Sequence, residues 1–420
     1  MKDRRVMLLF TFFIVGFVFI TVNLIKIQII DWKKYSVQVQ DMGTRIIVNQ
    51  AKRGNIYDRD GNLMAWNQKI FQIENLQSEL SQESVKKIKE ILSKEDLLLD
   101  NVIDKLNFQK KITLEINSTT AKKLSALNDL IVTEKYIRKY AHESLYHFIG
   151  YVDREGNPRT GLEKDWNEKL KGQNGYQLVN ITPSGKIKNI LEEIPAISGN
   201  NIYTTIDLSL QEKVYDILSE QKNPAAVVVS DPNTGEILAM VSYPSPDPNQ
   251  FSKGLTNLEL SRILNDKNSP LINRTISSKY FPGSIIKPFI ALSALELGIS
   301  PDATVNSTGK YYLKDSRGNV IGSYDDWNVL GHGITNMIKS LRVSANYYYY
   351  WLGETLGIDI MKEKSIFYKF DDLTDIDVPG EVKGVFPSVD WKMQNLGEMW
   401  YPGESLLAYI GQGYVTNTPI

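Results

Sequence analysis

A long uncharged run near the N-terminus constrains this chain more than any other feature. Residues 6–25 contain no charged side chain and are almost wholly apolar. About twenty helical residues span the ~30 Å hydrocarbon core of a bilayer. Because Lys2, Arg4 and Arg5 precede the run, the positive-inside rule keeps the N-terminus in the cytoplasm. We predict that residues 1–30 form a cytoplasmic stub and an uncleaved, single-pass transmembrane signal anchor in the cytoplasmic membrane.

Two alternatives compete with the anchor. A cleaved signal peptide has a shorter apolar region and an Ala-x-Ala-like site after it, and neither feature is found here. A buried helix of a soluble domain normally has a polar face, which this run lacks. The anchor interpretation places the rest of the chain on the outer side of the membrane.

Composition excludes several classes of function. At 420 residues the chain is long enough for two or three domains. The absence of cysteine excludes thiolate catalysis, disulfides and cysteine-based metal sites. His142, His147 and His332 are too few and too scattered for a persuasive histidine metal site. A net charge of -1 gives no support for a nucleic-acid partner.

Local patterns predict a mixed α/β domain that begins near Thr204. Residues 225–242 read as two apolar strands around a tight turn formed by Asp, Pro, Asn and Gly. A helix is predicted after Pro282, ending at Gly298, and a second over residues 334–343. The aromatic run 347–351 is interpreted as core packing.

The preceding region, residues 31–200, is polar and mixed in composition. Residues 81–92 place Val85, Ile88 and Ile91/Leu92 at helical spacing, and the lysines of this segment are predicted to lie on a solvated face.

With cysteine absent, a serine–lysine pair is the nucleophile arrangement that remains. The pattern Ser-x-x-Lys is weak, because it starts four times in this chain, at Ser84, Ser219, Ser284 and Ser307. Two copies are expected in polar, solvated helices (Ser84 and Ser219), and Ser307 is expected in a loop. At least three of the four must therefore be accidental.

Ser284 differs from the other copies by its context. It follows Phe-Pro-Gly and opens an apolar helix. Residues three apart on a helix are neighbours, so Lys287 can reach the Ser284 hydroxyl. The positive end of the helix and the flanking apolar side chains both disfavour an ammonium group, which would lower the pKa of the lysine toward that of a usable base. The alternative is a helix-capping serine beside a surface lysine, and the tetrapeptide alone favours that alternative.

A second motif, Ser344-Ala345-Asn346, follows sixty residues downstream. A hydroxyl and an amide presented together can relay a proton and hold a peptide group. The pattern Ser-x-Asn is also common by chance and recurs at Ser198.

These residues carry a resemblance to a known family. Residues 280–288 (YFPGSIIKP) resemble the active-site serine motif of class B penicillin-binding proteins, and 344–346 (SAN) resemble their second motif. Four further blocks match in order from about residue 45 onward. They are 53–65 (RGNIYDRDGNLMA), 147–152 (HFIGYV), 161–164 (GLEK) and 230–242 (SDPNTGEILAMVS).

Two groups of motifs are most similar to those of the elongation-type members, penicillin-binding protein 2. They are Asp326-Trp327 with residues 331–333 (GHG), and Trp400-Tyr401 with residues 411–416 (GQGYVT). The division-specific transpeptidases are the nearest alternative.

The resemblance implies an α+β fold. An N-terminal transmembrane helix would precede an elongated, mixed α/β pedestal (dimerisation-type) domain at residues 31–200. A penicillin-binding, β-lactamase-like αβα transpeptidase domain would occupy residues 201–420. The third family motif, Lys-Thr-Gly or Lys-Ser-Gly, does not occur in the sequence. We therefore expect the chain to be incomplete before the last strands of that domain, and the given chain to be inactive for that reason.

The resemblance also implies the chemistry. Ser284 would attack the D-Ala-D-Ala bond of a peptidoglycan stem peptide, and Lys287 would accept its proton. Ser344 would protonate the leaving amine and Asn346 would bind the substrate backbone. An amine of a second stem would then resolve the acyl-enzyme, and β-lactams would acylate Ser284. This chemistry would require no metal and no cofactor.

A polytopic membrane glycosyltransferase of the elongation machinery is the expected protein partner. Two other functions remain open, namely a catalytically silent scaffold that activates this glycosyltransferase, and a β-lactam sensor or β-lactamase-like hydrolase. The pedestal blocks argue against the sensor and the hydrolase, because those proteins lack them.

Overall fold

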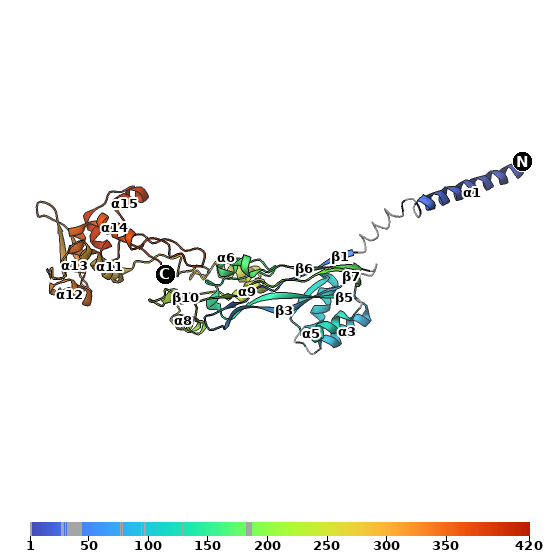
Figure 1. Ribbon diagram of the computed structural model, residues 1–420, viewed down its shortest axis with the longest axis horizontal. Coiled ribbons are helices and arrows are strands. Elements are labelled where there is room, and N and C mark those ends of the chain that lie inside the picture. The colour runs from blue at the N-terminus through green and yellow to red at the C-terminus, as the bar shows by residue number, and fades with distance from the viewer. Residues whose placement is uncertain are drawn as a thin grey trace. The chain divides into compact units, whose positions relative to one another are not determined.

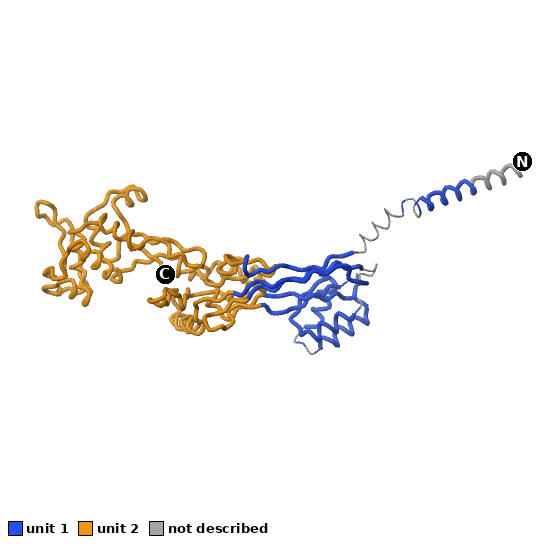
Figure 2. Tube along the Cα trace, viewed as in Figure 1, with its two compact units in different colours: residues 1–54, 67–137, 168–201 blue, residues 55–66, 138–167, 202–420 orange. Residues whose placement is uncertain are grey.

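The computed structural model describes residues 2–26, 29, 31, 44–75, 77, 79–93, 95, 98–127, 129–181 and 187–420 (Figure 1). Its chain divides into two compact units (Figure 2). Unit 1 comprises residues 1–54, 67–137 and 168–201, and unit 2 comprises residues 55–66, 138–167 and 202–420. The predicted domain boundaries at residues 30 and 200 stay predictions.

The N-terminal segment forms helix α1 (Lys2–Ile25). The side chains of its first residues, up to position 12, lie outside the described set. Within the part of the chain that is described, a helix with the length and apolarity needed to cross a membrane is not found. The anchor therefore stays a prediction.

Unit 1 contains a three-stranded antiparallel sheet, ordered β1 (Thr44–Asn49), β6 (Gly175–Ile181) and β7 (Ile187–Ile194). Its register pairs Arg45 with Val179. The Val179 side chain is fully buried, whereas Ile46, the next residue along β1, is mostly exposed. This alternation is what a sheet with one covered face requires.

Three helices and a short strand contribute to a hydrophobic core in unit 1, which also contains Phe71, Ile73 and Leu130. The helices and the strand are α3 (Gln82–Leu92), α4 (Leu99–Phe108), β4 (Lys111–Leu114) and α5 (Ser118–Ser125). The helical spacing predicted for residues 81–92 is confirmed, because Ile88 and Leu92 are buried in this core. Ser81 caps α3, where its hydroxyl accepts the Ser84 N–H at 3.1 Å.

Two long strands, β3 (Leu63–Asn75) and β5 (Leu130–Tyr140), contribute residues to both units. They pair with each other, and β3 also pairs with β4 and with β2 (Ile56–Tyr57). In turn, β2 pairs in parallel with β8 (Ile202–Tyr203). Short helical segments complete this part: η2 (Glu143–Leu145), α6 (Gly161–Asp165) and α7 (Asn167–Leu170).

The strand hairpin predicted at residues 225–242 is confirmed. Strands β9 (Ala225–Ser230) and β10 (Ile237–Tyr243) pair antiparallel, and helix α8 (Leu208–Gln221) precedes them. In the turn, the Asp231 carboxylate accepts the Asn233 N–H at 2.8 Å, and Gly235 has a φ of +78°. The aspartate and the glycine thus act as the turn formers that the sequence indicated.

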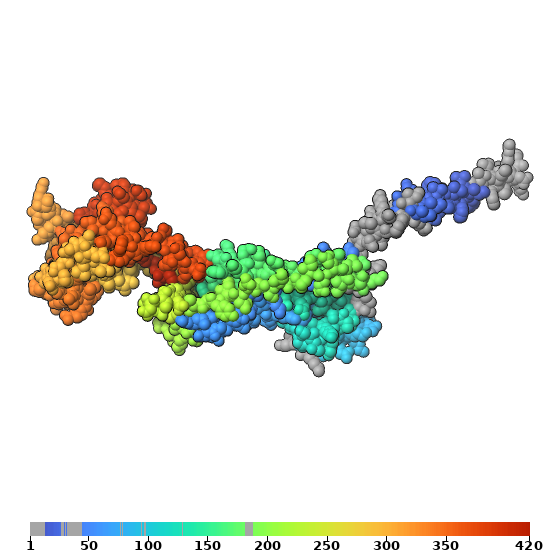
Figure 3. All heavy atoms as spheres, in the orientation of Figure 1, coloured from blue at the N-terminus to red at the C-terminus, as the bar shows by residue number. Residues whose placement is uncertain are grey.

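The rest of unit 2 is mainly helical, and its C-terminal residues are coloured orange to red in Figure 3. Its helical elements are α9 (Pro248–Lys253), α10 (Asn257–Leu264), η3 (Gly283–Ile286), α11 (Lys287–Glu296), α12 (Met337–Arg342), α13 (Asn346–Leu356), α14 (Ile358–Phe367), α15 (Val389–Leu396) and α16 (Pro402–Ala408). Two small hairpin-like pairs accompany them, β11 (Val305–Ser307) with β14 (Gly333–Thr335), and β12 (Lys310–Lys314) with β13 (Val320–Asp325).

The core of this helical region holds the aromatic run of α13. Tyr348, Tyr349 and Tyr350 are buried beside Ile290 of α11 and Phe386. The prediction that this run packs in a core is confirmed.

Three local predictions were wrong. Ile334 lies in strand β14, so the helix expected from this residue begins only at Met337. Ser307 is buried at the end of strand β11, where its carbonyl accepts the His332 N–H at 3.1 Å. Ser84 is not solvated, because it is buried and hydrogen-bonds to Asp129. In each case a partner distant in sequence overrides the local pattern.

Candidate active site

The turn that carries Ser284 is a short 3-10 helix, η3, which leads directly into α11. The 3-10 turn places Ser284 on the exposed side and Lys287 on the buried side, where it retains only 2% of its surface. The predicted helix does begin beyond Pro282, and it ends at Glu296, where the Gly298 N–H donates to the Leu295 carbonyl. The first turn is tighter than expected, so the serine precedes the α-helix itself.

A close backbone contact holds this turn in place. The Gly283 N–H donates to the Gly411 carbonyl at 2.9 Å. A Cβ atom at Gly411 would lie 2.3 Å from the Gly283 oxygen, so a larger residue cannot occupy this position without displacing the turn. Gly411 belongs to the GQGYVT block, and the contact gives that block a physical role beside the nucleophile.

The buried amine of Lys287 joins the two motifs. Among the described residues it makes three hydrogen bonds, to the Ser344 carbonyl at 2.9 Å, the Ser344 hydroxyl at 3.1 Å and the Asn346 side-chain oxygen at 2.7 Å. The lysine also lies over the Tyr349 ring, 5.2 Å from its centre. Residues 57 positions apart in sequence are thus in direct contact.

Burial governs the protonation of this lysine. Loss of solvent lowers the pKa of Lys287 from 10.5 to about 8, while the negative charge of Asp326 acts in the opposite direction. A neutral amine fits the three contacts equally well. Its two N–H groups can donate to the Ser344 carbonyl and to Asn346, and its lone pair can then accept a hydroxyl proton.

Ser344 has an unusual backbone conformation. Its φ is +51°, in the left-handed region that non-glycine residues rarely adopt. The conformation turns the chain between α12 and α13, and it allows both the carbonyl and the hydroxyl of Ser344 to accept from Lys287. Strain of this kind persists where the surrounding contacts fix it, and it is common at functional sites.

The predicted site residues border one hollow. A cavity of about 640 Å³ is lined by Ser284, Ser344 and Asn346, together with Trp327, Arg342 and Val343. Lys287 lies beneath it and does not line it. The predicted residues therefore lie together, although the lysine is hydrogen-bonded to the second motif and not to Ser284. In free enzymes, catalytic hydrogen bonds are often incomplete and tighten only when substrate binds.

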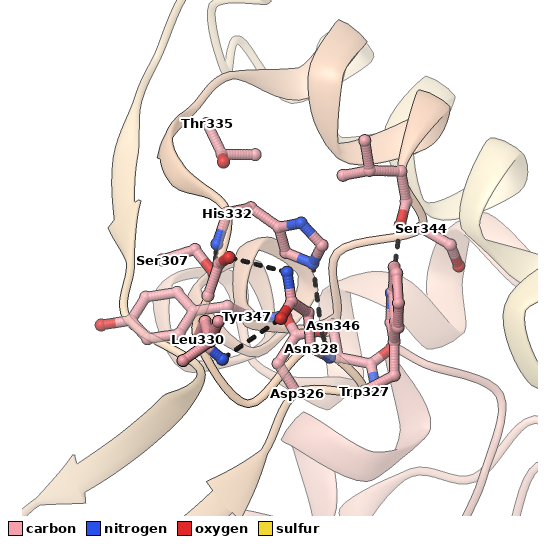
Figure 4. Close-up of polar contacts among 12 residues, drawn as sticks. Ser307, Asp326, Trp327, Asn328, Leu330, His332, Thr335, Ser344, Asn346 and Tyr347 are labelled. Atoms are coloured by element: carbon pink, nitrogen blue, oxygen red, sulfur yellow. Dashed lines mark hydrogen bonds and ion pairs between the residues drawn. The ribbon is translucent and has the colours of Figure 1, made fainter.

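A polar network beside the second motif was not predicted as part of the site. Figure 4 shows Asp326, Trp327 and His332 close to Ser344 and Asn346. The Trp327 indole N–H donates to the Val343 carbonyl at 3.1 Å, and the Asp326 carboxylate accepts the Tyr347 N–H at 2.9 Å. The sequence had indicated these residues only as markers of subtype.

Comparisons with known proteins agree with this geometry. The family profile described as "Penicillin binding protein transpeptidase domain" matches residues 225–420, and "Penicillin-binding Protein dimerisation domain" matches residues 48–204. The "Peptidoglycan D,D-transpeptidase MrdA" of Escherichia coli is 31% identical over 438 residues, covering 95% of this chain and 67% of that protein. The chain belongs to the penicillin-binding protein 2 family of peptidoglycan D,D-transpeptidases.

Other relatives and structures support this membership. The MrdA protein of Salmonella typhimurium is 30% identical over 99% of this chain and 71% of its own length. The Helicobacter pylori structure "Complex between Penicillin-Binding Protein (PBP2) and MreC" matches with a TM-score of 0.73 and 26% identity, over 90% of this chain and 74% of that chain. The Pseudomonas aeruginosa PBP2 structure in complex with WCK 5153 matches with a TM-score of 0.65 and 27% identity, covering 90% and 68%.

Family membership confirms the α+β transpeptidase fold with a dimerisation pedestal. It also confirms the function, a serine-type, penicillin-binding D,D-transpeptidase of peptidoglycan biosynthesis, of the elongation type.

Proposed function

We propose that Ser284 is the acylated nucleophile of this transpeptidase and that Lys287 is its general base. The observation that carries the proposal is the environment of Lys287. Its amine is buried, has a pKa of about 8 and is hydrogen-bonded to both polar residues of the second motif. A lysine on a solvated surface would remain an ammonium at neutral pH and could not accept the serine proton.

In the acylation step, the Ser284 oxygen attacks the carbonyl between the two terminal D-alanines of a stem peptide. The serine proton moves to the neutral Lys287 amine as the new C–O bond forms. Collapse of the tetrahedral intermediate breaks the C–N bond, and the leaving amine of D-alanine takes a proton through the Ser344 hydroxyl, which Lys287 resupplies. Asn346 holds the substrate backbone. The products are a Ser284 ester and free D-alanine.

In the second step, the amine of a neighbouring stem peptide attacks the ester carbonyl. Lys287, now neutral again, accepts the proton that this amine loses, and the departing Ser284 oxygen regains a proton from Lys287. A new amide cross-links the two stems, and the enzyme returns to its starting state. β-Lactams follow the first step only, because the opened ring remains attached to Ser284.

Intact-mass spectrometry with a reporter penicillin tests this proposal directly. The product of the complete reading frame, solubilised in detergent, should gain a single adduct that maps to the peptide containing Ser284. Ser284→Ala should abolish the adduct and leave the fold intact. Ser219→Ala is a matched control, because Ser219 begins another Ser-x-x-Lys pattern and its hydroxyl donates to the Asp216 carbonyl within its own helix, α8.

Persistent labelling of Ser284→Ala would contradict the assignment of the nucleophile. If the wild-type protein were folded and gained no adduct, the catalytic proposal would fail, and the silent scaffold predicted as an alternative would take its place.

We also propose that the N-terminal segment anchors the protein in the cytoplasmic membrane, with the N-terminus inside and the catalytic unit outside. The uncharged run at residues 6–25 and the basic residues before it support this topology. Because the chain contains no cysteine, single cysteines introduced as Lys2→Cys and Lys253→Cys report on each side. A membrane-impermeant maleimide added to whole cells or spheroplasts should label only the second variant, and the reverse pattern would contradict the topology.

A polytopic glycosyltransferase of the elongation machinery is the partner that we propose for unit 1 and the anchor. A structural relative titled "Structural coordination of polymerization and crosslinking by a peptidoglycan synthase complex" matches with a TM-score of 0.70 and 26% identity. Co-purification of the two proteins from one membrane extract is the expected result. Loss of co-purification on deletion of residues 2–30, with retention in Ser284→Ala, would separate assembly from catalysis.

A further inference from the structure

Asp326 is a buried carboxylate that the proposed chemistry does not use. It lies just beyond strand β13, retains 3% of its surface overall, and its side chain is fully buried. Its N–H donates to the Gly309 carbonyl at 2.9 Å, which fixes the start of the loop. Burying a carboxylate costs free energy unless hydrogen bonds or opposite charges compensate it. The groups that contact Asp326 therefore indicate its role.

The strongest partner of Asp326 is the start of helix α13. The position before the helix is Ala345, which has no side chain able to cap the free N–H groups. One carboxylate oxygen of Asp326 accepts the Tyr347 N–H at 2.9 Å instead. Asp326 therefore supplies from a distant loop the cap that a serine or aspartate normally provides locally. The capped turn is the one that carries Asn346.

The second carboxylate oxygen of Asp326 faces the loop that follows Asp326 in the chain. It lies 3.4 Å from His332 Nε2 and 3.4 Å from the Asn328 N–H. Lys339 donates to the His332 carbonyl at 2.6 Å, which ties this loop to α12. Both ends of the Ser344 turn are thus connected to the Asp326 loop, one through Lys339 of α12 and the other through Tyr347 of α13. Figure 4 shows Asp326 and His332 of this loop.

Asp326 also acts on Lys287 through space. Its negative charge raises the pKa of Lys287 against the lowering effect of burial. Among the described residues, the Tyr349 ring also faces this lysine, at 5.2 Å from its amine. His332 and Lys339 lie farther along the Asp326 loop, where His332 contacts the Asp326 carboxylate and Lys339 donates to the His332 carbonyl.

We propose that Asp326 is a positioning residue of the transpeptidase, which caps α13 to hold Asn346 and Ser344 in place and sets the charge felt by Lys287. The proposal rests on the function assigned above to Ser284 and Lys287. It predicts two separable effects, because the cap needs only an acceptor oxygen whereas the electrostatic effect needs the negative charge.

Two substitutions separate these effects. Asp326→Asn keeps an acceptor oxygen for the Tyr347 N–H and removes the charge. Asp326→Ala removes both. Asp325→Asn is the matched control, since Asp325 is the preceding residue and its exposed side chain pairs with Lys310 at the surface. All are made in the product of the complete reading frame, and acylation by a reporter penicillin is followed from pH 6 to pH 10.

In Asp326→Asn, the limb of the profile that rises with pH should move to lower pH, because a lysine without the nearby anion loses its proton more readily. The plateau rate should stay within about twofold of the wild type. In Asp326→Ala the plateau rate should fall about tenfold, because the turn holding Asn346 loses its cap. Hydrogen exchange at the Tyr347 amide should accelerate in Asp326→Ala only.

Superimposable profiles for Asp326→Asn and Asp325→Asn would refute the electrostatic effect. Wild-type plateau rate and wild-type protection of the Tyr347 amide in Asp326→Ala would refute the positioning. If wild-type Ser284 itself took no label, the function proposed for the site would fail instead, and the Tyr347 exchange measurement would still decide the capping.

Discussion

Two lysines in unit 2 are equally buried and have opposite properties. Lys287 in the candidate site retains 2% of its surface, and Lys392 in α15 retains 1%. The Lys287 amine contacts neutral oxygens, and its pKa is lowered to about 8 by burial. Burial alone would also lower the pKa of Lys392, but its contacts with Glu404 and Glu398 outweigh that effect and raise the pKa to about 12.

The difference lies in the partners and not in the depth of burial. Lys392 Nζ lies 2.5 Å from a Glu404 oxygen and 3.0 Å from the Met399 carbonyl, which makes it a permanent cation within a structural cluster. Lys287 has no carboxylate in hydrogen-bond contact among the described residues, so its neutral form is accessible near physiological pH. A buried lysine becomes a base only where the surroundings withhold a counter-ion.

The sharpest test exchanges each lysine for a residue of similar shape without charge. Lys287→Met should reduce acylation by about 10²–10⁴-fold, the usual contribution of a general base, and should leave the melting temperature unchanged or raised. Lys392→Met should do the reverse. It should lower the melting temperature by removing the cation that pairs with the Glu404 carboxylate, while the protein that remains folded is acylated at nearly the wild-type rate. Equal losses of acylation in both variants would contradict the comparison.

The position of the nucleophile beside Lys287 should depend on Gly411. Gly411→Ala places a methyl group against the Gly283 carbonyl, displaces the turn that carries Ser284 and should reduce acylation about 100-fold. Gly413→Ala is the control, because Gly413 has a similar φ of +70° and its added methyl group would meet only the Leu407 side chain, at 3.5 Å. If both variants lost the same activity, backbone strain and not the contact with Gly283 would be responsible.

The pH dependence should report Lys287 and not Lys392. With a pKa of about 8, about a tenth of Lys287 is neutral at pH 7 and about nine tenths at pH 9, so acylation should rise about tenfold between them. The sign for stability follows from the same shift. Because the pKa of Lys287 is lower in the folded state than in the unfolded state, the free energy of unfolding should increase as pH rises from about 8 toward 10.5. A rate that is independent of pH from 6 to 9 would contradict a lysine base with this pKa.

The smallest expected effect concerns the exposed cation of the site. Arg342 lines the hollow, where it can attract the carboxylate of a penicillin. Because exposed ion pairs contribute about 0.2–1 kcal/mol, Arg342→Ala should slow acylation by roughly 1.4- to 5-fold. The loss should shrink at high salt, and an effect that persists in 1 M salt would indicate a packing role for the side chain instead.

Sequence patterns predicted much of this protein from local chemistry. The hairpin at residues 225–242 follows from its turn formers, and helix α3 follows from the helical spacing of its apolar residues. Ser284 could be separated from three accidental Ser-x-x-Lys copies because its neighbours, Phe-Pro-Gly and an apolar helix, are themselves local features. The family motifs then indicated both the fold and the reaction.

Other properties depend on contacts between distant segments. The sequence predicted that Lys287 would face Ser284, whereas the structure directs its amine to Ser344 and Asn346. It assigned Asp326 and His332 only to a subtype marker, and it gave no sign that Asp326 caps α13. It also placed Ser307 in a loop and Ile334 in a helix, because the pairing of β11 with β14 joins segments that are far apart in the chain.

The sequence by itself determined which groups are present, namely a nucleophile, a base, a second serine and an amide, and it determined the local helices and turns that present them. The tertiary structure decided which partners each buried lysine meets, and so the size and the direction of its pKa shift. Lys287 and Lys392 have the same side chain, and each lies in a helix. One has a pKa near 8 and the other near 12 because packing surrounds the first with neutral oxygens and the second with carboxylates.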